Sequence, residues 1–282
     1  MSVLADLSND LAALVAEAGA RVVSVRAGQR RWSGLIWQTG LVVTADEAID
    51  GDDDVEVLFA DGRSATTTVA GRDPATDVAL LKLGTVETAS WTASGPVRAG
   101  MLAVVVGGGD GSANAGLTSI SEVGPAWRSL RGGEIDARVH LAQRLGSRNE
   151  GAAAVAPDGT LIGMAVSGPR RRALVIPAST IARAVATLSE KGYVPRGWLG
   201  VMLHPVGEGA IVLGIDAESP ADAAGLMVGD VITTWNGEPI DSVGGLAGRL
   251  ASASAQTQVK LGVLRGGNAS DIDVILGERA RG

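Results

Sequence analysis

The chain contains no cysteine, which excludes disulfide bonds, thiolate metal sites and a cysteine nucleophile. Only two histidines, one phenylalanine and one tyrosine occur among its 282 residues. A core poor in aromatic residues has to be built from Val, Leu, Ile and Ala. Together with 40 glycines, this composition favours many short strands joined by turns.

The chain also has no excess of basic residues, because it contains 24 Lys and Arg but 31 Asp and Glu, which gives a net charge of −7. This balance argues against a nucleic-acid partner, because phosphate neutralisation needs clustered basic residues. The basic run 170–172 is interpreted as a solvated loop. No apolar run is long enough for a membrane span, and residues 1–20 lack the pattern of a signal peptide. As written, the sequence predicts a cytoplasmic location.

Apolar periodicity predicts a mainly β chain behind an N-terminal amphipathic helix within residues 1–20, which carries Leu4, Leu7, Leu11 and Leu14 on one face. Two sets of six β-branched runs follow within residues 21–193. We expect strands at 22–25, 34–37, 41–44, 55–59, 65–70 and 78–83, and then at 101–106, 117–123, 135–141, 152–155, 161–166 and 173–176. Two such units fit a pair of closed β-barrels, because closure removes exposed strand edges. A helix is expected over 179–191.

Residues 194–282 form a separate C-terminal module that resembles a bacterial PDZ domain. The letters WLGV at 198–201 stand where that family has its carboxylate-binding loop, and SPADAAGL at 219–226 and GDVI at 229–232 follow its pattern. The resemblance implies capture of a free peptide C-terminus. The residues it implies for this role are Trp198, Leu199, Gly200, Val201 and Arg196 at the loop, and Leu246 and Leu250 on the helix beside the groove. We expect Gly200→Trp to block the loop and leave the fold intact.

Residues 40–50 and 71–83 are similar to the segments that carry the catalytic histidine and aspartate in the HtrA/DegP family of chymotrypsin-like serine proteases. Glu47 holds the position of the histidine, and Asp77 that of the aspartate. The nucleophile turn of the family aligns with 148–152, because the letters DGTLIG at 158–163 set the register. Glu150 therefore occupies the serine position, and Arg148 replaces a glycine whose N–H would help to bind the oxyanion.

Acyl transfer by this mechanism needs a nucleophile, a base and a group that orients the base, and only the last remains. The resemblance thus implies a chymotrypsin-like double β-barrel that is not an enzyme. We interpret the chain as a pseudoprotease that needs no cofactor and binds protein or peptide C-termini through its PDZ domain. HtrA-like proteins are commonly exported and often trimerise through the N-terminal part of the protease domain. The resemblance therefore implies a possible homo-oligomer, and a periplasmic location if the N-terminus has been trimmed.

Two alternatives stay open. In the first, a rearranged hydrolase uses Ser147 as nucleophile, although His140 and His204 lie in no matching motif. In the second, the carboxylates of Glu47, Asp77 and Glu150 hold a hard divalent cation, for which oxygen ligands are suited. The acidic run 50–54 lacks the spacing of a calcium-binding EF-hand and is interpreted as a solvated loop.

Overall fold

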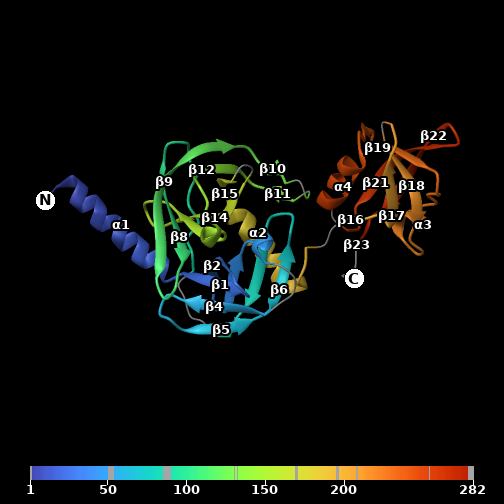
Figure 1. Cartoon of the computed structure of the whole chain (residues 1–282). Coiled ribbons are helices and arrows are strands. Elements are labelled where there is room, and N and C mark those ends of the chain that lie inside the picture. Colours follow the sequence, from blue (N-terminus) through green and yellow to red (C-terminus); the bar gives the residue numbers. More distant parts are fainter. Residues whose placement is uncertain are drawn as a thin grey trace. The chain divides into compact units, whose positions relative to one another are not determined.

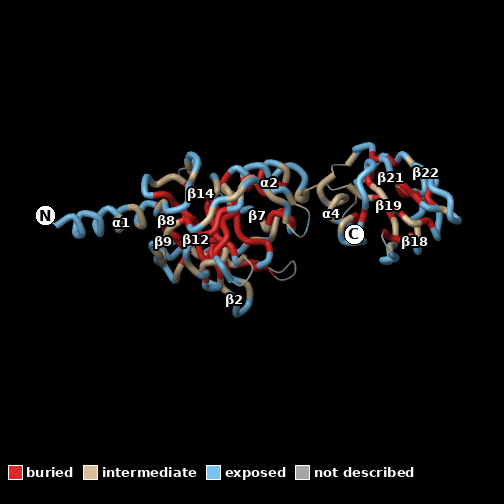
Figure 2. The backbone as a smooth tube through the Cα atoms, turned by 90° about the horizontal axis from the view of Figure 1, so that it is seen from above, coloured by how far each residue is buried: buried red, intermediate tan, exposed pale blue. Residues whose placement is uncertain are grey.

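A computed structural model describes residues 2–49, 54–84, 90–129, 131, 133–168, 171–194, 197–207, 209–253 and 255–278. The chain divides into two compact units, one of residues 1–127 and 134–194 and the other of residues 128–133 and 195–282. Each unit has its own apolar core, visible as the buried segments inside each part of Figure 2. Both cores are aliphatic for the most part, as the composition indicates.

The N-terminal helix α1 (Val3–Gly19) confirms the predicted amphipathic element. Its last two turns pack on the core of the first unit through Leu11, Leu14 and Val15. The first two turns run away from the sheets (Figure 1), and Leu4 there is 75% exposed. The apolar face is therefore only half covered within this chain.

The first sheet is antiparallel and has seven strands in the order β5-β4-β1-β2-β3-β7-β6. Their bounds are β1 (Val22–Ala27), β2 (Arg30–Gln38), β3 (Leu41–Thr44), β4 (Val55–Phe59), β5 (Ser64–Thr67), β6 (Val69–Asp73) and β7 (Val78–Lys82). The prediction of a single strand over 65–70 is wrong. That run is divided between β5 and β6, which lie at opposite edges of the sheet.

The division of this run brings the two edges of the sheet near each other. Only Thr68 separates the end of β5 from the start of β6, so the two edges of the sheet have to lie close together. The Thr67 hydroxyl in the edge strand β5 donates to the carbonyl of Lys82 in β7, the neighbour of the other edge strand, at 2.6 Å. A bend at one residue does not interrupt a β-branched sequence pattern, and the sequence therefore predicted six strands where the structure has seven.

The second half of this unit is a closed barrel in the order β12-β15-β14-β13-β8-β9, and five of the six predicted runs match its strands. The prediction of one strand over 135–141 is wrong, because Ile135 belongs to a separate short hairpin and the barrel strand begins at Arg138. Its strands are β8 (Leu102–Gly108), β9 (Ala113–Gly124), β12 (Arg138–Arg144), β13 (Ala152–Val155), β14 (Leu161–Ser167) and β15 (Arg172–Pro177). A short hairpin, β10 (Trp127–Arg128) and β11 (Glu134–Ile135), lies between β9 and β12 in the chain. Helix α2 (Ala178–Lys191) follows and ends at Gly192 in the left-handed conformation.

The C-terminal unit is a small antiparallel sheet with two short helices. The strand order is β17-β18-β19-β21-β22, with β20 paired to β19. Its elements are β16 (Gly197–Trp198), β17 (Val201–Pro205), β18 (Ala210–Ile215), α3 (Pro220–Ala223), β19 (Val231–Trp235), β20 (Glu238–Pro239), α4 (Val243–Ser252), β21 (Gln258–Arg265), β22 (Asn268–Ile275) and β23 (Gly277–Glu278). Strand β17 forms one edge of this sheet.

The first sheet and the barrel approach each other closely at two glycines. A Cβ atom at Gly108 would lie 2.1 Å from the carbonyl carbon of Val23, and one at Gly151 would lie 2.2 Å from the carbonyl oxygen of Ser33. Gly151 also has a φ of 81°, which L-residues with a side chain rarely adopt. These positions therefore require glycine for packing and, at Gly151, for backbone conformation as well.

We expect Gly151→Ala to lower the free energy of unfolding by about 2–4 kcal/mol, because strain and overpacking add. Gly62→Ala is the matched control, since Gly62 has a φ of 84° but no atom near its Cβ position. It should cost only about 1 kcal/mol. Urea unfolding of both variants measures the difference, and equal losses would contradict the close approach at Ser33.

Candidate functional site

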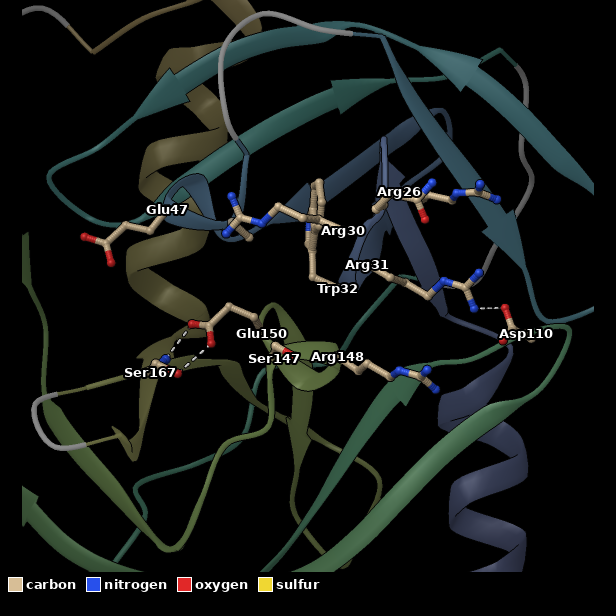
Figure 3. A pocket seen from close by; sticks show the side chains of 12 residues that line it. Arg26, Arg30, Arg31, Trp32, Glu47, Asp110, Ser147, Arg148, Glu150 and Ser167 are labelled. Atoms are coloured by element: carbon tan, nitrogen blue, oxygen red, sulfur yellow. Dashed lines mark hydrogen bonds and ion pairs between the residues drawn. The ribbon is translucent and has the colours of Figure 1, made fainter.

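A cleft of about 760 Å³ lies in the first unit, with its side chains drawn in Figure 3. Strand β2 and the turn before it supply one wall, and two short 3-10 helices, η1 (Asp46–Ala48) and η2 (Ser147–Asn149), supply others. The cleft is lined by Arg26, Gln29, Arg30, Arg31, Trp32, Glu47, Ala48, Asp110, Ser147, Arg148, Glu150 and Ser167. Two of the three candidate positions, Glu47 and Glu150, therefore open into the same space.

Asp77 holds the main chain at position 47. Its Oδ1 accepts a hydrogen bond from the backbone N–H of Glu47 at 2.8 Å. The turn before it is built by Asp73, whose carboxylate accepts from the backbone N–H of Ala75 at 3.2 Å and from the hydroxyl of Thr76 at 2.6 Å. This turn leaves Asp77 in the left-handed region with a φ of 57°, a conformation that Asp tolerates better than most residues.

The acidic surroundings of Asp77 disfavour its ionised form. Burial raises the pKa of Asp77 to about 7, against the effect of the hydrogen bond from Glu47. The negative charges of Glu47, Glu150 and Asp46 raise it further. A carboxyl group that orients a histidine would face a partial positive charge, and here the corresponding carboxyl faces other acids.

Asp46 has a cation of its own, which the sequence did not reveal. Asp46 is 3% exposed, and its carboxylate accepts a hydrogen bond from Nε–H of Arg72 at 2.6 Å. The same guanidinium donates to the carbonyls of Asp46 and Ile49 at 3.1 and 2.9 Å. These hydrogen bonds from Arg72 therefore hold η1 in place. Residues 50–53 of the acidic run that follows lie outside the described residues.

Glu150 is held by the end of β14. Its carboxylate accepts from the backbone N–H of Ser167 at 2.5 Å and from the Ser167 hydroxyl at 2.6 Å (Figure 3). Burial nevertheless raises the pKa of Glu150 above its ordinary value, with the charge of Glu47 adding to the shift. The backbone N–H of Glu150 donates to the carbonyl of Ser147 at 3.3 Å, so this donor is already engaged inside the η2 turn.

The two alternative interpretations of the acidic site find little support in this geometry. Within the described residues, no three His, Cys, Asp or Glu side chains are grouped as a metal site requires. Figure 3 shows the Glu47 side chain extending away from the Glu150 carboxylate. Ser147 is exposed, and the cleft lining contains neither histidine. His140 lies buried in β12, and His204 lies exposed on β17.

The second candidate site is the surface where β17 and α4 of the C-terminal unit meet, which the resemblance to PDZ domains implies as a peptide groove and which is called the PDZ groove below. In the loop before β17, the carbonyls of Leu199 and Gly200 accept from the N–H groups of Ala221 and Asp216. In the part of the chain that the structure describes, no backbone carbonyl accepts from the N–H of Leu199 or Gly200. Two adjacent donors at the end of an edge strand are suited to a carboxylate.

The other residues implied for this groove divide between core and surface. Leu199 and Leu246 are buried in the core of the unit, and Val201 and Leu250 are half-buried against it. Trp198 packs near Gly200, and Arg196 lies outside the described residues.

The expectation that Gly200→Trp leaves the fold intact is wrong. A Cβ atom at Gly200 would lie 2.2 Å from Cβ of Ser219, and the φ of 77° adds strain.

Comparison with known proteins matches each unit to a known kind of domain. Residues 32–164 match the model of the trypsin-like peptidase domain, and residues 197–276 match that of the PDZ domain. A probable periplasmic serine endoprotease, DegP-like, from Bartonella henselae is 31% identical over 86% of this chain. The chain is similar to HtrA/DegP-like proteins. A relative of the same description from Brucella suis is 30% identical over 86% of the chain. The chain spans about half the length of these relatives, namely 52% and 51%.

Solved structures of similar proteins have the same fold as this chain. The HtrA-type protease AlgW with a decapeptide has a TM-score of 0.71 at 22% identity, over 96% of this chain and 99% of that one. The serine endoprotease from Yersinia pestis also has a TM-score of 0.71 at 22% identity, and the match covers 96% of this chain and 98% of that one. Among the described residues, no helix combines the length and the apolar character needed to cross a membrane.

The raised pKa of Asp77 predicts that stability falls as pH rises from about 4 to about 7. In this window the folded state binds more protons than the unfolded state, whose aspartates have a pKa near 3.9. Asp77→Asn keeps an acceptor for the Glu47 N–H and tolerates the left-handed backbone. We expect it to raise the unfolding free energy at pH 8 by about 1–3 kcal/mol, discounted for partial solvent access.

Urea unfolding at pH 5 and pH 8 measures this effect. The native chain should lose stability between the two values, and Asp77→Asn should lose less. Asp61→Asn is the control, because Asp61 lies on an exposed turn and the pKa of its carboxyl is lowered by its bonds to Arg63. An unchanged pH slope in Asp77→Asn would contradict the assignment.

Proposed function

We propose that the protein is a non-catalytic HtrA/DegP-like scaffold that captures the free C-terminal ends of peptides or proteins in its PDZ groove. The observation that carries this proposal is the pair of backbone N–H groups at Leu199 and Gly200. Within the described residues they donate to no backbone carbonyl, and they lie at the end of the edge strand β17. An extended peptide can add to this edge by strand pairing while its carboxylate accepts from the loop.

The absence of catalysis rests on the chemistry of the cleft. Glu150 cannot form an acyl-enzyme as a serine does, and its carboxylate is already bound by Ser167. Glu47 is exposed, and its backbone N–H donates to the carboxylate of Asp77. The oxyanion turn has also changed, because the Glu150 N–H is engaged with the Ser147 carbonyl and Arg148 replaces glycine. Three separate requirements of acyl transfer are therefore unmet.

We expect the native chain to leave casein intact and to show no labelling by a fluorophosphonate. Glu47→His combined with Glu150→Ser should give at most weak hydrolysis, because the oxyanion turn is still altered. Adding Arg148→Gly to this pair should increase the rate, on the order of 10-fold or more if the turn then supplies a donor. Glu150→Ser alone is the control. Hydrolysis by the native chain that disappears in Ser147→Ala would overturn the assignment.

A peptide that ends in a free apolar residue should bind the full chain with roughly micromolar affinity. Amidating its C-terminus should remove most of that affinity, because the loop donors lose a charged acceptor. Fluorescence anisotropy with a labelled peptide library measures both. Equal binding of the acid and amide forms would show that the loop does not recognise the carboxylate.

Variants locate this binding on the groove. Leu250→Asp, on the α4 side, should weaken the binding of the free-acid peptide by about 10-fold or more, because it places a charge against the apolar side chain of the peptide. Leu213→Asp is the matched control, since Leu213 is half-exposed on β18 and outside the groove. Melting temperatures identify any loss of fold. Equal weakening by the two variants would argue against the groove as the binding site.

A further inference from the structure

The cleft of the first unit carries more positive charge than its acidic motif implies. Four of its twelve lining residues are arginines, namely Arg26, Arg30, Arg31 and Arg148. Gln29 and Ser147 add further hydrogen-bond donors to the lining. The PDZ groove does not involve this surface, so the proposed function leaves it without a role.

The acids that line the cleft do not neutralise all of these arginines. Asp110 pairs with Arg31, and Glu150 is bound by Ser167 rather than by a cation. Arg26 pairs weakly with Glu56, at 3.6 Å and on an exposed surface. The guanidinium of Arg148 has no partner among the described residues and is exposed to solvent. The Arg148 side chain therefore remains open to an anion.

A second observation points to the same place. The Trp32 side chain lies in the wall of the cleft and is 2% exposed, and its buried Nε1–H donates to no described atom. Leaving such a donor unpaired costs about 1–3 kcal/mol. Trp32 borders the cleft, and its indole N–H therefore reports on a ligand bound there, although this nitrogen has almost no accessible surface and a ligand oxygen reaches it only if the wall of the cleft moves.

The arginines are spread along the cleft. In Figure 3 the side chains of Arg26, Arg31 and Arg148 extend toward the side of Asp110, and Arg30 and Trp32 lie nearer to Glu47. Separate cations along one cleft match several carboxylates on an extended chain better than one compact ion. A volume of about 760 Å³ lies within the range of sites that enclose a ligand of several residues. The net charge of −7 disfavours a long polyanion such as nucleic acid.

We propose that this cleft binds an acidic peptide segment, with Arg148 as the main contact for a carboxylate. The ligand is recognised by side-chain carboxylates and needs no free C-terminus. The site is therefore separate in chemistry from the PDZ groove, and either one can fail experimentally without the other.

The test uses the full chain and a labelled eight-residue peptide of alternating Glu and Gly, blocked at both ends so that it offers no C-terminal carboxylate. Anisotropy should show saturable binding that weakens as salt increases, because the contacts are between partly exposed charges. The same peptide with Gln in place of Glu should not bind. Absence of binding by the Glu peptide at millimolar protein would overturn the proposal.

Arg148→Ala should weaken the binding of the acidic peptide by about 10-fold, as expected for the loss of a charge-assisted hydrogen bond. Arg148→Lys should recover part of this loss. Arg63→Ala is the matched control, because Arg63 is an exposed arginine on the β4–β5 turn and does not line the cleft. If Arg148→Ala and Arg63→Ala lose the same affinity for the acidic peptide, the effect comes from overall charge, and this outcome would overturn the proposed site.

A direct readout comes from the indole N–H signals in a proton–nitrogen NMR spectrum, with Trp32→Phe to assign one of them. The Trp32 signal should move during the titration, and that of Trp235 in the C-terminal unit should not. Free glutamate or inorganic phosphate that displaces the peptide at equal concentration would indicate a small-anion site and would contradict a peptide ligand. Binding of free apolar C-termini in the same samples reports separately on the PDZ groove.

Discussion

The hydrogen bonds of Ser33 hold the two halves of the first unit together and thereby position the cleft. Its backbone N–H donates to the carbonyl of Glu150 at 2.8 Å, and its hydroxyl donates to the carbonyl of Arg148 at 2.6 Å. The same hydroxyl accepts from the N–H of Gly108 at 3.1 Å, and the Ser33 carbonyl accepts from the hydroxyl of Thr44 at 2.7 Å. Because Ser33 is fully buried, leaving these groups unpaired would be costly, and the η2 turn is fixed relative to β2.

This rigid support explains how a protease-like scaffold persists with different chemistry in its cleft. The backbone geometry depends on Ser33, on the close approach of Gly151 and on the bond from Glu47 to Asp77. None of these interactions needs a catalytic side chain at position 47 or 150. Carboxylates can therefore occupy both positions, where their charges add to the rise in the pKa of Asp77 that burial mainly causes, and the bonds from Ser167 hold the second carboxylate in place.

The two units offer two kinds of recognition. The PDZ groove presents main-chain donors and an apolar surface, which suit a peptide end and are insensitive to most of the peptide sequence. The cleft presents guanidinium groups on a wall that contains a buried indole N–H, which suits side-chain carboxylates. Main-chain recognition is weakly affected by salt, whereas recognition by partly exposed charges is strongly affected. The two sites are thus distinguishable by solution conditions alone.

The sequence by itself determined the helix at the N-terminus, five of the six strands of the barrel and the PDZ pattern, and it places Glu47 and Glu150 in segments that resemble those of a serine protease. These features follow from local periodicity, turn residues and motif register, all of which lie within short windows of the chain. Tertiary structure alone decided that residues 65–70 are divided between two edges of one sheet, that Asp46 pairs with Arg72, and that Ser167 rather than Arg148 binds Glu150. Each of these outcomes joins elements that are distant in sequence or bends the chain at one residue, and no local pattern records which partner a buried charge will meet.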